Sequence, residues 1–105
     1  MTRIKAAAIR TEENEVWWVP APGRHHNVIW LMRDFGCSVE CIAASEEGFV
    51  TDVNEFVSRS AALTIARASG QLLEEYRKLA DDLGELYSEF VGNTLRGPGF
   101  TLSVV

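Results

Sequence analysis

The chain is expected to fold as an α/β (α+β) domain, in which a small antiparallel sheet of hairpins packs with two to three helices. Three observations predict this fold. Short runs of β-branched and aromatic residues come in pairs separated by polar turns, which is typical of hairpins. Other segments carry apolar residues at helical spacing. Each of these helical patterns ends at a glycine, which readily adopts the left-handed backbone that closes a helix.

The first predicted hairpin joins residues 4–10 to residues 15–19 through the polar turn 11–14. Because successive side chains of a strand point to opposite faces, Trp17 and Trp18 cannot enter the same core. We expect one tryptophan to lie beneath a helix and the other to face a partner subunit or a ligand.

Residues 24–35 are predicted to form the first helix, after a segment rich in proline and glycine that ends the preceding strand. On this helix His25 should lie near the buried face, whereas His26 should lean toward Trp30. The expected apolar stripe consists of Val28, Ile29, Met32 and Phe35.

Residues 37–45 carry the weakest pattern, which allows either a strand in which Val39, Cys41 and Ala43 alternate, or part of a loop. Cys37 and Cys41 are spaced C-x3-C, and no second cysteine pair completes a zinc site. A buried thiol pair is the preferred interpretation, and a disulfide stays open.

The second predicted hairpin joins residues 46–51 to residues 55–57. Ser58 should cap a helix over residues 59–69, whose inward side chains are Ala62, Ile65, Ala66 and Ser69.

An amphipathic helix is predicted over residues 72–83, with a core stripe of Leu72, Tyr76, Leu79 and Leu83. Residues 1–91 are therefore expected to form a single domain. Residues 92–105 are expected to form a glycine-rich connector and a C-terminal strand, in which Phe100, Leu102 and Val104 alternate with polar residues.

Composition and charge restrict the function. The 105 residues are 47% hydrophobic and carry a net charge of −5, which fits one soluble domain and argues against a binder of duplex nucleic acid. The sequence shows no signal peptide, transmembrane run or lipidation motif, so we expect a cytoplasmic protein with no membrane partner. No nucleophile, metal or phosphate-loop motif is present, so we expect a non-enzymatic protein without a cofactor.

The best candidate site is the cationic start of the first helix. The helix is expected to begin at Arg24, His25 and His26. Free backbone N–H groups at a helix start attract anions, and the helix dipole makes positive side chains unfavourable there. Arg59 opens the next long helix in the same way and would form the other half of a phosphate clamp. The two helix starts are therefore expected to meet at one edge of the sheet.

Structural interpretations of the same residues stay open. Arg24 would then be a surface residue paired with an acid, His25 a core histidine bonded to a carbonyl, and Arg59 an ordinary solvated charge.

Residues 87–89 offer a stacking ring, a hydroxyl and an acceptor for a ribose or a base amine, from Tyr87, Ser88 and Glu89. Equally, Leu86 and Tyr87 would only seal the core while Glu89 is solvated.

Several stretches together resemble a family of small phage-encoded proteins that includes the anti-Thoeris sponges. The stretches are IKAAAIR (4–10), PAPGRHH (20–26), GFVT (48–51), FVSR (56–59) with Ala62, Ile65, Ala66, Gly70 and Gln71, and LYSE (86–89). Such sponges sequester a cyclised ADP-ribose signal, and some members also hold cyclic oligonucleotides. The resemblance implies an α/β fold, a homo-oligomer (dimer or higher) and ligand pockets at subunit boundaries. The chain departs from the pattern at Gly23, at residues 90–91 and in the glycine-rich tail.

The sequence is compatible with three functions. The first is a non-catalytic counter-defence protein that binds and sequesters a cyclic nucleotide immune signal. The second is an inhibitor of a bacterial defence complex that acts through Trp17 or Trp18 and the helix predicted over residues 72–83, which is rich in acidic residues. The third is a small nucleotide hydrolase that uses His25 or His26 as a general base.

Overall fold

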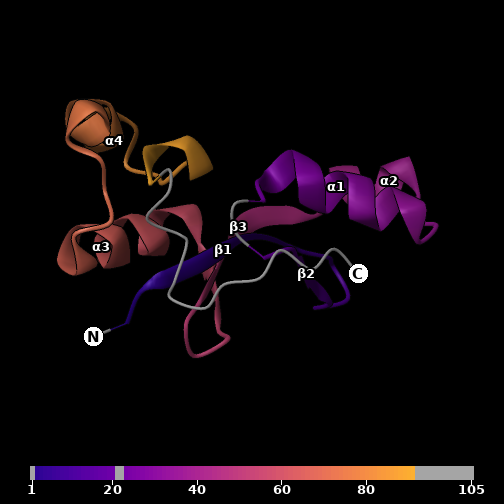
Figure 1. The fold of residues 1–105 in the computed structure, drawn as a ribbon. Coiled ribbons are helices and arrows are strands. Elements are labelled where there is room, and N and C mark those ends of the chain that lie inside the picture. Colours follow the sequence, from indigo (N-terminus) through magenta and orange to yellow (C-terminus); the bar gives the residue numbers. More distant parts are fainter. Residues whose placement is uncertain (1, 21–22, 92–105) are drawn as a thin grey trace.

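The protein was analysed as a computed structural model, which describes residues 2–20 and 23–91. Four strands form one antiparallel sheet in the order β2-β1-β3-β4 (Figure 1). The strands are β1 (Ile4–Arg10), β2 (Val16–Trp18), β3 (Glu46–Thr51) and β4 (Phe56–Ser58). The predicted α+β class and both predicted hairpins are confirmed.

The two hairpins use the same turn. The backbone carbonyls of Thr11 and Thr51 each accept a hydrogen bond from the N–H of the asparagine three residues later. Each threonine hydroxyl accepts a hydrogen bond from the N–H of the glutamate four residues later. Asn14 and Asn54 adopt positive φ angles of 66° and 63°, which asparagine tolerates better than most residues. The repeated pattern Thr-x-x-Asn-Glu therefore sets the register of both hairpins.

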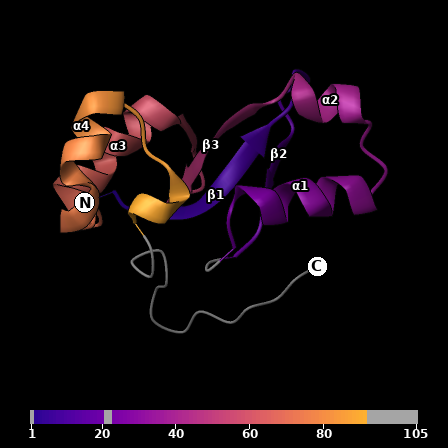
Figure 2. The ribbon, with the colours of Figure 1, turned by 90° about the horizontal axis from the view of Figure 1, so that it is seen from above.

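The described residues also form four helices and two 3₁₀ turns. They are α1 (His25–Asp34), α2 (Val39–Ala43), α3 (Arg59–Ser69), η1 (Glu74–Tyr76), α4 (Arg77–Leu83) and η2 (Ser88–Phe90). Figure 2 shows α1 and α2 at one end of the sheet and α3 with α4 at the other. Accordingly α1 contacts β1 and β2, whereas α3 contacts β3 and β4 and also reaches the central strand β1.

The core is divided in the same way. One cluster joins Ile9 and Val19 to α1. The larger cluster joins Ala7 and Phe49 to α3 and to the segment around Phe90. As expected, the tryptophans separate: Trp17 packs beneath α1, and Trp18 packs against Ala6, Ala8 and Val50 on the other face.

Residues 37–45 form neither of the predicted structures, because Val39–Ala43 is a short helix. Ser38 caps it by accepting a hydrogen bond from the N–H of Cys41 at 3.0 Å. Five residues are too few to show a helical period, so the alternation at Val39, Cys41 and Ala43 was misleading. Cys37 and Cys41 are free and only partly buried.

The prediction for residues 72–83 was partly wrong. Leu72 and Tyr76 pack in the core as predicted, but the segment turns through η1 before α4 begins, and this change of pitch rotates Leu79 and Leu83 away from the core. Leu79 and Leu83 are 47% and 48% exposed, while Ala80 is fully buried. Leu86 and Phe90 fill the core instead. The connector and strand predicted for residues 92–105 lie outside the described residues.

Candidate functional site

The starts of α1 and α3 meet over Gly48 in β3. Gly48 pairs with Ser58, the residue that caps α3 by accepting from Ala61 N–H. Its carbonyl oxygen accepts a hydrogen bond from His25 Nε2 at 2.7 Å, at the first residue of α1. A Cβ at Gly48 would lie 2.3 Å from the carbonyl oxygen of Val57, so only glycine fits between the two helix starts.

Arg24 is the N-cap residue of α1, and its backbone N–H donates to the side chain of Asn27 at 2.9 Å. Its guanidinium reaches across to the segment after α4. The Nε atom donates to Ser88 Oγ at 3.1 Å, and Nη2 lies 3.6 Å from Glu89 Oε2. The side chains of Arg24 and Glu89 are 46% and 52% exposed, so this ion pair is solvated and weak.

Arg59 is held much more tightly. Its Nη1 donates to the carbonyl of Leu86 at 2.8 Å, its Nη2 pairs with the carboxylate of Glu47, and its guanidinium lies 4.4 Å above the Tyr87 ring. The Leu86 N–H donates back to the Arg59 carbonyl at 2.9 Å. The side chain is only 16% exposed, so its interpretation as an ordinary solvated charge is wrong.

His25 is buried and neutral. Burial is the main cause that lowers the pKa of its imidazole, the cations of Arg59 and Arg24 lower it further, and the bond to Gly48 and the charge of Glu47 oppose them. Because a carbonyl only accepts, Nε2 carries the proton and Nδ1 is left as an acceptor. The ring also meets Phe49 edge-on at 5.1 Å.

Six of the seven predicted site residues come together at this place. They are Arg24, His25, Arg59, Tyr87, Ser88 and Glu89. The seventh, His26, is exposed and packs against Trp30, with ring centroids 5.0 Å apart, as its position on the helix predicted. The structural contacts expected for Arg24 and His25, an acid and a carbonyl, are both present. Leu86 is buried in the core, also as expected.

Glu47 was not predicted as part of the site, although its position carried a signal. Glu47 and the buried Phe49 are two residues apart in β3, so their side chains lie on the same face of the sheet. The carboxylate of Glu47 must therefore point toward the helices, where it needs a cation. Arg59 supplies that cation. Glu46, of opposite parity, pairs with Arg10 instead, at 2.7 Å.

Chemically, this arrangement can hold an anion. It combines two guanidiniums, a helix start, a hydroxyl and an aromatic ring. It also contains the carboxylates of Glu47 and Glu89, of which Glu89 is held only by the weak pair with Arg24. Ser88 Oγ contacts a guanidinium, which cannot take up a proton, so this contact provides no general base. Among the described residues, no group of three or more potential ligands could hold a metal ion.

The longest described helix, α3, has 11 residues, against the roughly 20 that a membrane-spanning helix needs. Residues 3–91 match the family model described as phage T4 y16D protein. No curated protein and no solved structure matches the chain. The matched span includes every strand and helix of the structure and every residue of the candidate site.

Proposed function

The chain belongs to the phage T4 y16D protein family, and we propose that this phage protein binds a small phosphate-bearing nucleotide without converting it. The observation that supports the proposal is the convergence, over Gly48, of two helix starts that each carry an arginine. The half-exposed guanidinium of Arg24 is the group that the ligand reaches first.

Exchange of partners at Arg24 is the binding step. A phosphate oxygen takes the place of the Glu89 carboxylate, which lies 3.6 Å away and is half exposed. Losing such a solvated pair costs about 0–1 kcal/mol, whereas a charge-assisted bond to a phosphate is roughly twice as strong as a neutral one. Ser88 keeps the guanidinium in place through Nε, so the two terminal nitrogens are oriented before the ligand arrives.

Arg59 and Tyr87 form the second part of the surface. The guanidinium covers the ring at 4.4 Å, and the hydroxyl of Tyr87 donates to Glu85 at 3.2 Å. These contacts fix the ring, which is partly exposed, and a ribose or base lies against its exposed part. The Arg59 charge adds to the positive potential that a second phosphate would meet.

The ligand class is a cyclic nucleotide signal, either cyclised ADP-ribose or a cyclic oligonucleotide, and the role is counter-defence by sequestration. The stretches that resemble anti-Thoeris sponges include PAPGRHH, FVSR and LYSE, and these contain Arg24, Arg59 and Ser88. Three of the five stretches thus contribute residues that contact one another, Arg24 with Ser88 and Arg59 with Tyr87.

A second candidate function is inhibition of a host protein through an apolar surface. Trp30, Phe35 and Val39 are 56%, 62% and 74% exposed and lie on α1, after its end and on α2. The helices α1 and α2 lie at one end of the sheet, and large exposed apolar side chains there are candidates for contact with a protein.

The test is retention and release. The protein is incubated with cyclised ADP-ribose and a panel of cyclic oligonucleotides, separated from free ligand, denatured, and the released nucleotides are analysed by mass spectrometry. Arg24→Gln is the variant, and Arg33→Gln, which removes an exposed arginine on the same helix, is its control.

Release of an intact nucleotide from the wild type and from R33Q, but not from R24Q, would support the proposal. A chemically altered product would instead mean an enzyme. No retained nucleotide would favour the inhibitor of a host protein.

A further inference from the structure

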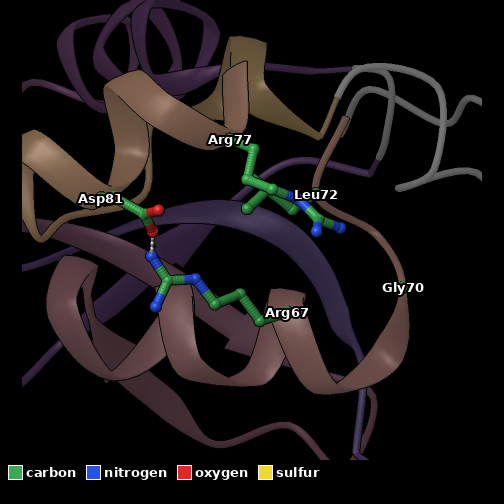
Figure 3. A pocket seen from close by; sticks show the side chains of 5 residues that line it. All are labelled: Arg67, Gly70, Leu72, Arg77 and Asp81. Atoms are coloured by element: carbon green, nitrogen blue, oxygen red, sulfur yellow. Dashed lines mark ion pairs between the residues drawn. The ribbon is translucent and has the colours of Figure 1, made fainter. Parts of the chain in front are cut away.

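A pocket of about 440 Å³ lies between the end of α3 and the beginning of α4. Its lining residues are Arg67, Gly70, Leu72, Arg77 and Asp81 (Figure 3). None of them belongs to the surface over Gly48. The volume falls within the range of roughly 300–1,000 Å³ that small-molecule sites occupy.

The base of the pocket is fixed to the sheet. Gly70 ends α3 with a φ of +75°, and the next two N–H groups both bond to the Ala66 carbonyl, which reverses the chain. Gln71 is 1% exposed and exchanges two hydrogen bonds with the backbone of Ile4, at 2.7 and 2.8 Å. The glycine and the apolar Leu72 therefore present a rigid surface to whatever enters.

The charges around this base favour an anion. Arg67, in the last turn of α3, pairs across the opening with Asp81 of α4. Arg77, the first residue of α4, also lines the pocket (Figure 3). The lining itself thus holds two guanidiniums and one carboxylate, and a second carboxylate, that of Glu74, lies beside Arg77 outside the lining.

Both arginines are free to exchange partners. Arg77 Nε lies 3.4 Å from Glu74, and these two side chains are 63% and 84% exposed. Arg67 and Asp81 are 46% and 55% exposed. Ion pairs with this much solvent contribute little, so a ligand with a doubly charged group competes with them at small cost.

We propose that this pocket is a second binding site, independent of the surface over Gly48, and that it takes a small organic phosphate such as a nucleoside monophosphate. The phosphate lies between the guanidiniums of Arg67 and Arg77, and the base or sugar lies on Leu72. The carboxylate of Asp81 accepts from a hydroxyl of the ligand or keeps one guanidinium oriented.

The experiment is a titration of isotope-labelled protein with adenosine monophosphate, followed through the backbone amides of residues 70–72 and the arginine Nε–H signals. Arg77→Gln is the main variant, because its ion pair is exposed and its loss should leave the melting temperature unchanged. Lys78→Gln removes the same charge one residue away, outside the pocket lining, and is the matched control.

We expect saturable shifts at Arg67, Arg77 and residues 70–72, about tenfold weaker binding for R77Q, and a change of less than about twofold for K78Q. Adenosine, which lacks the phosphate, should cause no saturable shifts. Arg67→Gln should weaken binding as well, and it serves as the second variant if R77Q does not fold.

Absence of shifts at concentrations up to about 10 mM, where even a weak site would be occupied, would overturn the proposal. Equal affinities of R77Q and K78Q would also overturn it. Shifts centred on Arg24 and Ser88 would mean that adenosine monophosphate binds only at the surface over Gly48, again against the second site. Arg24→Gln separates the two proposals, because it should leave the shifts at Arg67 and Arg77 unchanged.

Discussion

Arg24 and Arg59 stand at the starts of two helices that meet over the same glycine, yet the protein uses them differently. Arg59 is 16% exposed and has three contacts, to the Leu86 carbonyl, the Glu47 carboxylate and the Tyr87 ring. Arg24 is 46% exposed, with one hydroxyl and one distant carboxylate as partners. From their positions in the sequence both arginines are expected to have the same role, whereas their burial separates a residue that holds the fold together from one that solvent can reach.

The largest expected effect is the loss of stability when Arg59 is replaced. Arg59→Gln removes a charge-assisted bond and a cation–π contact and leaves the Leu86 carbonyl without its donor, so we expect a loss of about 2 kcal/mol. Urea unfolding of this variant and of R33Q measures the difference. A loss within about 0.5 kcal/mol of the R33Q value would mean that the contacts of Arg59 with Leu86 and Tyr87 do not stabilise the fold.

A double-mutant cycle tests whether both arginines serve one ligand. If a diphosphate spans them, the double variant of Arg24 and Arg59 should lose less affinity than the sum of the single losses, with a coupling of about 1 kcal/mol. Binding should also weaken as salt is added. Additive losses, or unchanged affinity for Arg59→Gln, would restrict the contact to Arg24.

His25 should give the smallest effect, a change in the pH dependence of stability. Its folded pKa lies below its ordinary value because the imidazole is buried, so the unfolded chain binds a proton more readily. Its contribution is therefore complete above a pH of about 6.5 and is lost as the pH falls through the folded pKa. In His25→Gln, unfolding free energy measured between pH 7 and 5 should fall less steeply than in His26→Gln. Identical slopes would contradict the buried neutral imidazole.

Much of the fold could be predicted because its signals are local. The turns at Asn14 and Asn54, the cap at Ser58 and the stop at Gly70 each depend on residues within a few positions. The failures have equally local reasons. The helix Val39–Ala43 is too short for its period to be seen, and the 3₁₀ turn before α4 shifts Leu79 out of the core.

The candidate site shows a different limit. Helix-start chemistry singled out Arg24 and Arg59, but the distance along the chain hid their partners. Ser88 lies 64 residues after Arg24, and nothing in the sequence pairs them. Glu47 could have been recognised by its parity with Phe49 in β3. How buried each arginine is depends on the packing of the segment after α4, which no local pattern gives.

The most direct test of the account is the affinity of Arg24→Gln for a nucleotide that the wild type retains, measured by titration calorimetry beside R33Q. We predict at least about tenfold weaker binding for R24Q, an unchanged melting temperature, and wild-type affinity for R33Q. Equal affinities of R24Q and the wild type would show that the two helix starts are a structural junction and not the place where a nucleotide is held.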